Sequence, residues 1–157
     1  MNVKSIAIAT LVAGTLDIGS AIAMTAAHGK SVGAMLRTVA SGPFGDGVAQ
    51  LGAAGAIAGL AVHFGIMTAM VTIFAAAVDR LPALRRRPVG FGVAYGLLLY
   101  LVMYWVVIPL RWPVALNHIR LESIANALAI HVLLVGIPIA WLVVRPVGSL
   151  ARPVPKP

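Results

Sequence analysis

The sequence predicts an all-α membrane protein, a four-helix transmembrane bundle with a short interfacial helix between spans one and two. Hydrophobic residues make up 61% of the chain and charged residues only 10%, against about 45–50% and about 25% in soluble domains. Segment 51–77 has no Asp, Glu, Lys or Arg, and it exceeds the roughly 20 apolar residues that cross a bilayer. Strands of a membrane barrel would instead alternate apolar and polar residues over about ten positions.

Composition also limits the classes of function. The net charge of +8 does not indicate a nucleic-acid partner, because Lys and Arg stand at the ends of apolar segments rather than along one exposed face. The chain has no cysteine, so disulfides, thiolate catalysis and iron–sulfur ligation are excluded. No nucleophile–base pair, carboxylate pair or phosphate-binding loop is recognisable. We therefore expect no enzyme and no catalytic, cofactor or metal site, with the lipid bilayer as a partner.

The first predicted span covers about 5–27. A cleaved secretory signal is the competing interpretation, because Lys4 precedes an apolar run and segment 21–23 has the small-x-small form of a cleavage site. However, the apolar character continues past Ala23, and Asp17 lies where a signal would be most hydrophobic. The sequence therefore favours a retained membrane helix.

A short amphipathic helix is predicted after this span, lying at the membrane interface. Its apolar positions recur at helical spacing opposite Lys30 and Arg37, and they are Val32, Met35, Leu36 and Val39. The run 41–47 follows, with three glycines and a proline. We expect this run to form a turn, because a regular helix does not tolerate such a composition throughout.

Three further spans are predicted, at about 51–78, 89–110 and 123–144. The link 81–88 is strongly basic and contains two prolines, which end the second helix. Aromatic residues gather at the far end of the third span, as they do at membrane interfaces; these are Tyr104, Trp105 and Trp112. The four spans form one predicted domain, 1–145. The basic, proline-rich tail 146–157 is expected to be unstructured.

The distribution of basic residues predicts the orientation, because Lys and Arg concentrate in cytoplasmic loops. Most of them fall on one side of the predicted bundle: Lys4, Arg80, Arg85, Arg86, Arg87, Arg145, Arg152 and Lys156. The other side has only Lys30, Arg37, Arg111 and Arg120. Both termini are therefore expected in the cytoplasm.

One polar side chain per helix falls near the middle of the membrane. With a rise of about 1.5 Å per residue, Asp17, His63, Tyr100 and His131 lie at about the same depth. An ionisable group at that depth costs about 2.5 kcal/mol or more, so it usually faces the bundle interior and has a partner. We expect these four residues to form an intramembrane polar cluster.

Stripes of small residues lead to the same positions and predict close helix packing. Gly55, Gly59 and His63 follow one another at i, i+4 spacing, which places two bare backbone positions and one imidazole on a single helix face. The predicted packing glycines are Gly14, Gly55, Gly59, Gly92 and Gly96.

Three interpretations of the cluster are open. In the first, Asp17 pairs with His63 or His131 and only fixes the packing. The protein is then a small accessory or homo-oligomerising membrane component, with a second copy or another membrane protein as partner. In the second, Asp17 and His63 carry a proton in a proton-coupled small-solute carrier or channel. In the third, His63 and His131 are axial haem ligands of an electron-transfer protein. We expect the first, with no cofactor.

Several segments resemble a group of small, uncharacterised four-span bacterial inner-membrane proteins. The segments that carry the resemblance are 14–18, 39–45, His63-Phe64, Tyr95-Gly96 and 103–110. The chain departs from the pattern at Pro43-Phe44, where aliphatic residues are more usual. The resemblance implies a bacterial plasma-membrane location and the same four-helix bundle, and it implies no reaction.

Overall fold

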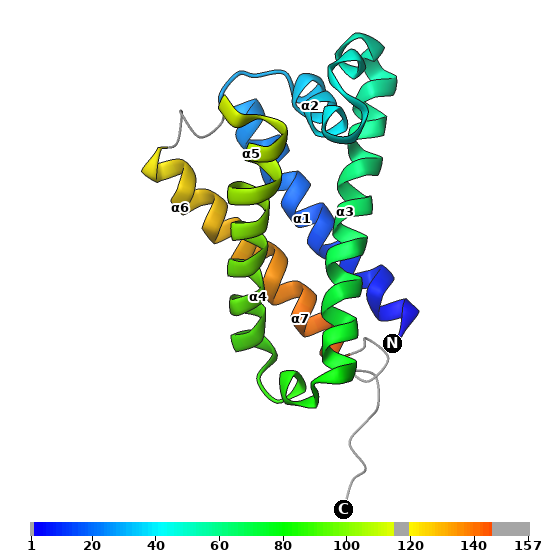
Figure 1. Ribbon diagram of the computed structural model, residues 1–157, viewed down its shortest axis with the longest axis vertical. Coiled ribbons are helices and arrows are strands. Elements are labelled where there is room, and N and C mark those ends of the chain that lie inside the picture. Colours follow the sequence, from blue (N-terminus) through cyan, green and yellow to red (C-terminus); the bar gives the residue numbers. More distant parts are fainter. Residues whose placement is uncertain (1, 115–119, 146–157) are drawn as a thin grey trace, which may run out of the picture.

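The computed structural model describes residues 2–114 and 120–145 (Figure 1). Every regular element within these residues is a helix, and four helical stretches are long and apolar enough to cross a membrane. The all-helical class with four candidate spans is therefore confirmed. The predicted tail 146–157 lies outside the described residues.

The first two candidate spans are long α-helices, α1 (Val3–Ala27) and α3 (Gly52–Arg80). The side chain of Asn2 caps α1 by accepting a hydrogen bond from the Lys4 backbone N–H at 3.0 Å. A 3-10 turn, η1 (Asp46–Leu51), precedes α3. A second one, η2 (Pro82–Arg85), follows it and returns the chain to the bundle.

The third and fourth spans each contain a π-helical turn. The third span consists of α4 (Pro88–Val102), η3 (Met103–Val107) and α5 (Ile108–Arg111). The fourth consists of α6 (Leu121–Ile130), η5 (His131–Gly136) and α7 (Ile137–Val144). All four spans begin and end within two residues of the expected positions.

A proline explains each π-helical turn. Pro109 and Pro138 follow η3 and η5. Proline has no N–H to donate, and its ring would collide with the carbonyl four residues earlier in an α-helix. A wider turn relieves both problems. The N–H before each proline therefore donates to a carbonyl five residues earlier, from Ile108 to Met103 and from Ile137 to Val132.

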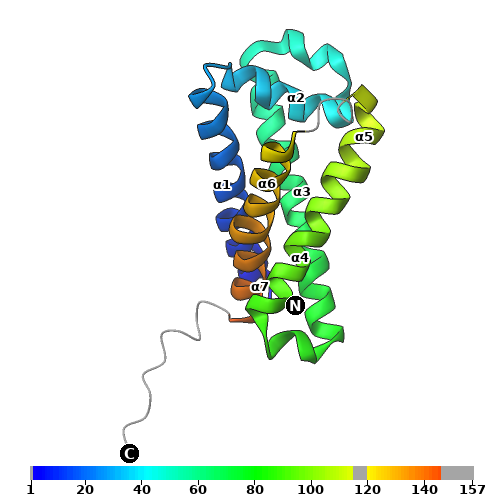
Figure 2. The same cartoon turned by 90° about the vertical axis from the view of Figure 1, so that its left-hand side faces the viewer.

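A shorter helix, α2 (Val32–Phe44), crosses one end of the bundle (Figures 1 and 2). Ser31 caps it, because the Ser31 hydroxyl accepts from the Ala34 N–H at 3.2 Å. The turn expected at 41–47 starts later than predicted, since α2 continues through Pro43. Pro43 lies in the last turn, where Gly45 closes the helix by donating to the Ser41 carbonyl at 3.0 Å and adopts φ 78°.

Glycines allow two pairs of helices to make backbone contacts. A methyl group added at Gly59 would collide with the carbonyl of Leu36 in α2, and one added at Gly55 would lie 2.7 Å from the Val48 carbonyl. On the other side of the bundle, Gly92 and Gly96 of α4 pack in the same way against η5 and α7. Such close approach is how helices associate in lipid, where burial of apolar surface gives no driving force.

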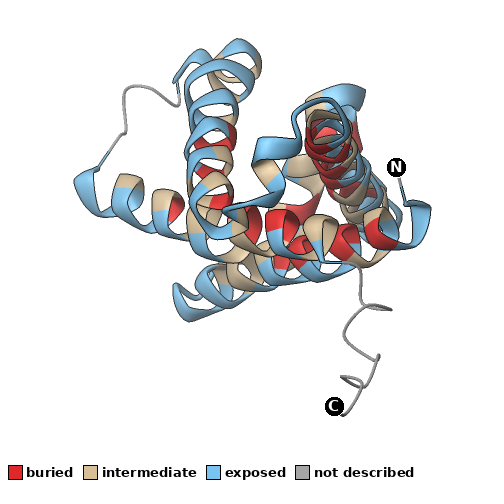
Figure 3. Cartoon of the chain, turned by 90° about the horizontal axis from the view of Figure 1, so that it is seen from below, coloured by how far each residue is buried: buried red, intermediate tan, exposed pale blue. Residues whose placement is uncertain are grey.

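The two halves of the bundle are packed differently. The apolar core lies toward the end where α1 begins and α7 ends; its members are Ala9, Ala13, Met67, Val71, Phe74, Val78, Leu99, Val135, Ile139 and Ala140. Figure 3 shows the buried residues gathered between the helices and exposed residues around the outside. The half covered by α2 contains a cavity lined by both polar and apolar side chains.

Candidate functional site

The candidate site is a cavity of about 560 Å³ in the half of the bundle covered by α2. Its walls come from α1, α2, α3, η3, α5, α6 and η5. They include exposed residues of α6 and its N-terminal flank, Arg120 and Glu122. They also include buried side chains of α3, His63 and Met67. The cavity therefore joins the surface of the bundle to its middle.

His63 connects α3 to α1 through a buried hydrogen bond. Its Nε2 lies 3.0 Å from the carbonyl oxygen of Gly14. A carbonyl can only accept, so Nε2 carries the hydrogen and the tautomer is fixed. Gly14 allows α1 to lie this close to α3, because a methyl group at Gly14 would lie 2.6 Å from the ring of Phe64 in α3.

Asp17 stands one helical turn after Gly14 and faces the same imidazole. Its Oδ2 lies 3.9 Å from Nδ1 of His63, too far for a hydrogen bond. Its side chain is 25% exposed, and it lines the cavity. Because Nε2 holds the hydrogen of a neutral His63, Nδ1 then presents a lone pair toward the carboxylate. One added proton converts this repulsion into an attraction between the two groups.

Tyr100 and His131 form a second group, joined by Tyr104. The Tyr104 ring stacks on Tyr100 with centroids 5.1 Å apart and meets the His131 ring edge-on at 5.6 Å. Nδ1 of His131 donates to the carbonyl of Ala127 in its own helix at 2.9 Å. His131 and Tyr104 line the cavity together with Asp17 and His63. Tyr100 is buried behind them, outside the cavity lining.

Tyr104 was missed as a site residue, because the sequence placed it in an interfacial aromatic belt. It is 39% exposed and faces the cavity. A signal was present in the sequence: Tyr104 is four residues after Tyr100, so it continues the same helix face. Gly136 was also missed; it packs against the backbone of Gly92 and Gly96.

His63 and His131 are the axial ligands in the third interpretation of the cluster, the haem site. In the structure Nε2 of His63 is engaged by the Gly14 carbonyl, and its Nδ1 lies 3.9 Å from Oδ2 of Asp17. Within 2–114 and 120–145, no three His, Cys, Asp or Glu side chains are grouped so that they could hold a metal ion.

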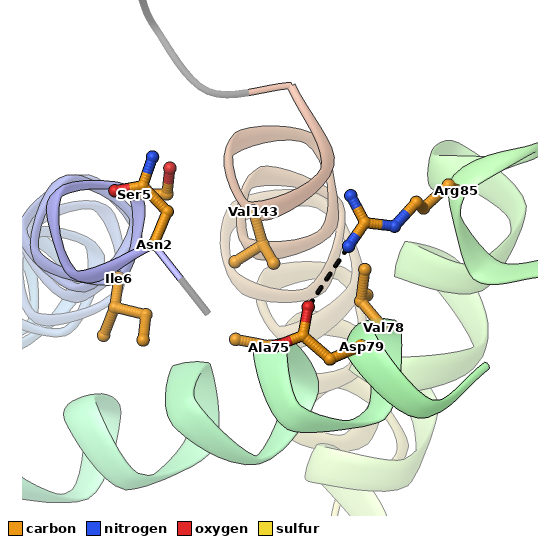
Figure 4. Close-up of a pocket in the computed structure, with 8 residues that line it drawn as sticks. All are labelled: Asn2, Ser5, Ile6, Ala75, Val78, Asp79, Arg85 and Val143. Carbon is orange, nitrogen blue, oxygen red and sulfur yellow. Dashed lines mark hydrogen bonds and ion pairs between the residues drawn. The ribbon is translucent and has the colours of Figure 1, made fainter. Parts of the chain in front are cut away.

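A smaller cavity, about 270 Å³, lies at the opposite end of the bundle (Figure 4). It lies between α1, α3 and α7, and Arg85 of η2 reaches over it. The guanidinium of Arg85 donates to Asp79 at 3.1 Å. This bond joins η2 to the end of α3, because η2 folds back toward it.

Comparison with known proteins gives no further guide to the role of these cavities. The chain matches no protein-family model, no curated protein and no solved structure. The resemblance to small four-span bacterial proteins therefore stays a prediction, and the functional argument depends on the geometry of the site.

Proposed function

We propose that the chain is an integral protein of the bacterial inner membrane that binds a proton at Asp17 and His63, in a proton-coupled small-solute carrier or channel. Both termini are proposed to lie in the cytoplasm. The single observation that carries this function is the carboxylate of Asp17, which faces Nδ1 of His63 from the wall of an open cavity in the middle of a candidate span.

The orientation follows from combining the fold with the basic residues. The end of the bundle opposite α2 carries Lys4, Arg80 and the run 85–87. The positive-inside rule assigns that end to the cytoplasm. The 560 Å³ cavity then opens toward the periplasm, and α2 lies at the outer membrane–water interface.

The geometry favours a proton site over a purely structural pair. A structural carboxylate in lipid is expected to be satisfied by hydrogen bonds between helices. Asp17 instead stands 3.9 Å from its neighbour and remains partly exposed to the cavity. One proton bound by either group leaves the pair without net charge, and the cavity that Asp17 lines exposes its carboxylate to a proton donor.

A structural role is the second candidate, and the His63–Gly14 hydrogen bond favours it. This bond joins α1 to α3 in the buried centre of the protein. In that case the chain is a small accessory or homo-oligomerising membrane component, and Asp17 is dispensable.

Proton flux in liposomes separates the two candidates. Proteoliposomes with a potassium diffusion potential should take up protons faster than protein-free liposomes, as followed by an internal pH dye. We expect Asp17→Asn to lower this rate at least tenfold, because an amide cannot exchange the proton. Asp46→Asn, at an exposed carboxylate of η1, should retain the rate. Equal rates for the wild type and Asp17→Asn would remove the carrier function and leave the structural role.

A further inference from the structure

All internal methionines of the chain line the same cavity. The sequence contains six methionines, and those after Met1 are Met24, Met35, Met67, Met70 and Met103. Each of these five side chains borders the 560 Å³ cavity. They come from α1, α2, α3 and η3, so no single amphipathic helix accounts for their gathering.

Histidines lie beside the methionines on the cavity-facing side of α3 and at the C-terminal end of α1. His63, Met67 and Met70 of α3 are spaced i, i+4, i+7, which places them on one face. On α1, Met24 is followed four residues later by His28, whose ring also lines the cavity. His131 of η5 completes the set of imidazoles.

Methionine is often a flexible filler of apolar cores, and this is the competing explanation. The distribution argues against it. The buried members of the packed core are Ala, Val, Ile, Leu and Phe with Met67 as the one methionine among the described residues, and Met70 packs against this core. Met24, Met35 and Met103 lie outside this core and border the cavity.

The donor chemistry points to a soft metal ion. Thioether sulfur together with imidazole nitrogen selects Cu⁺ and its analogue Ag⁺, whereas Ca²⁺, Mg²⁺ and Mn²⁺ prefer oxygen ligands. One ring nitrogen of each histidine donates a hydrogen bond to a backbone carbonyl, Nε2 in His63 and Nδ1 in His131. The other nitrogen, Nδ1 of His63 and Nε2 of His131, keeps a lone pair that can coordinate a metal ion. The carboxylate of Asp17, 3.9 Å from Nδ1 of His63, balances one positive charge at this depth.

We propose that the cavity binds a soft monovalent cation of the Cu⁺ class through methionine sulfur and histidine nitrogen, with Asp17 as the counter-charge. This inference rests on the proposed carrier function, since it names the cargo of the same cavity.

The test is Ag⁺ binding to the purified full-length chain in detergent micelles, measured by competition with a chromophoric chelator. Ag⁺ is used because it does not change oxidation state. We expect saturable binding of one ion per chain, and X-ray absorption at the silver edge should show sulfur ligands. The double variant Met67→Leu, Met103→Leu keeps the side-chain volume and removes two thioethers. It should weaken binding at least tenfold.

The matched control is Ile66→Leu, which reshapes the wall of the same cavity and removes no donor. It should bind as the wild type does, and circular dichroism with size exclusion should show that all variants are folded. Absence of saturable Ag⁺ binding in the wild type, or equal affinity in the double methionine variant, would overturn the inference.

The experiments can rule out the metal site and the proton site independently of each other. No Ag⁺ binding, with proton flux still abolished by Asp17→Asn, would remove the metal inference and retain the carrier. Methionine-dependent Ag⁺ binding, with flux unchanged in Asp17→Asn, would support the metal site and remove the proton step.

Discussion

The half of the bundle near the chain termini and the half covered by α2 differ in how tightly their helices are packed. In the first half, Gly92, Gly96 and Gly136 bring the backbones of the third and fourth spans into contact beside a dry core. In the second half, polar and thioether side chains surround an open volume, and one interhelical hydrogen bond, from His63 to Gly14, crosses between α1 and α3. Close backbone contacts hold helices together in both halves, since Gly59 of α3 also meets the Leu36 carbonyl of α2, and the second half keeps the 560 Å³ cavity beside them.

The largest expected effect on the free energy of unfolding comes from a substitution in the packed half. A methyl group added by Gly96→Ala would collide with the carbonyl of His131 and lie 2.7 Å from Cα of Val132. The third and fourth spans must then move apart, and overpacking of this kind costs about 1–3 kcal/mol. Unfolding in mixed micelles of SDS and a mild detergent, followed by circular dichroism, measures the loss.

The matched control for that change is Gly90→Ala, earlier on the same helix, where an added methyl group has no neighbour within 4 Å. Alanine favours helix by up to about 1 kcal/mol over glycine, so stability should not fall. A loss as large as that of Gly96→Ala would show that the backbone contact does not hold the two spans together.

A smaller effect is expected from the hydrogen bond that joins α3 to α1 in the cavity half. His63→Leu removes the bond to Gly14 and should cost about 0.6–1.7 kcal/mol, the range measured for interhelical bonds in membranes. His131→Leu should cost less, because Nδ1 of His131 bonds to Ala127 of its own helix. Thermal unfolding in detergent compares the two, and a reversed order would contradict the assignment of His63 as the link between α1 and α3.

The smallest effect on stability is expected from Asp17→Asn. The carboxylate accepts no hydrogen bond from the described residues at 3.5 Å or less and stays partly exposed. Its replacement should therefore change the free energy of unfolding by less than about 0.5 kcal/mol, as for positions without such contacts. The same unfolding assay applies. A loss above that of His63→Leu would favour the structural role of the cluster over the carrier.

The spans were predictable because long apolar runs ending at charged or proline residues have few alternatives in lipid. Matched depth likewise brought Asp17 and His63 into one prediction, and the structure selects His63, rather than His131, as the neighbour of Asp17. Depth alone could not divide the cluster, since it carries no information on rotation about each helix axis. That rotation separates Tyr100 from the cavity and turns Tyr104 toward it.

The cavity itself could not be predicted from the sequence. Its volume depends on how far the helices diverge beyond their glycine contacts, and no local pattern encodes that distance. The methionines were visible in the sequence, but on four different elements they look like ordinary apolar residues. Only the fold shows that they share one surface.

The π-helical turns have a consequence for chain length. A π-helical turn holds one residue more than the α-helical path requires. The third and fourth spans thus each contain a single-residue insertion, beside Tyr104 and at His131. One residue corresponds to about 100° of rotation around a helix. Deleting one residue from either turn would restore the α-helical path and swing the side chains on one side of it by that angle, away from the cavity that they now border.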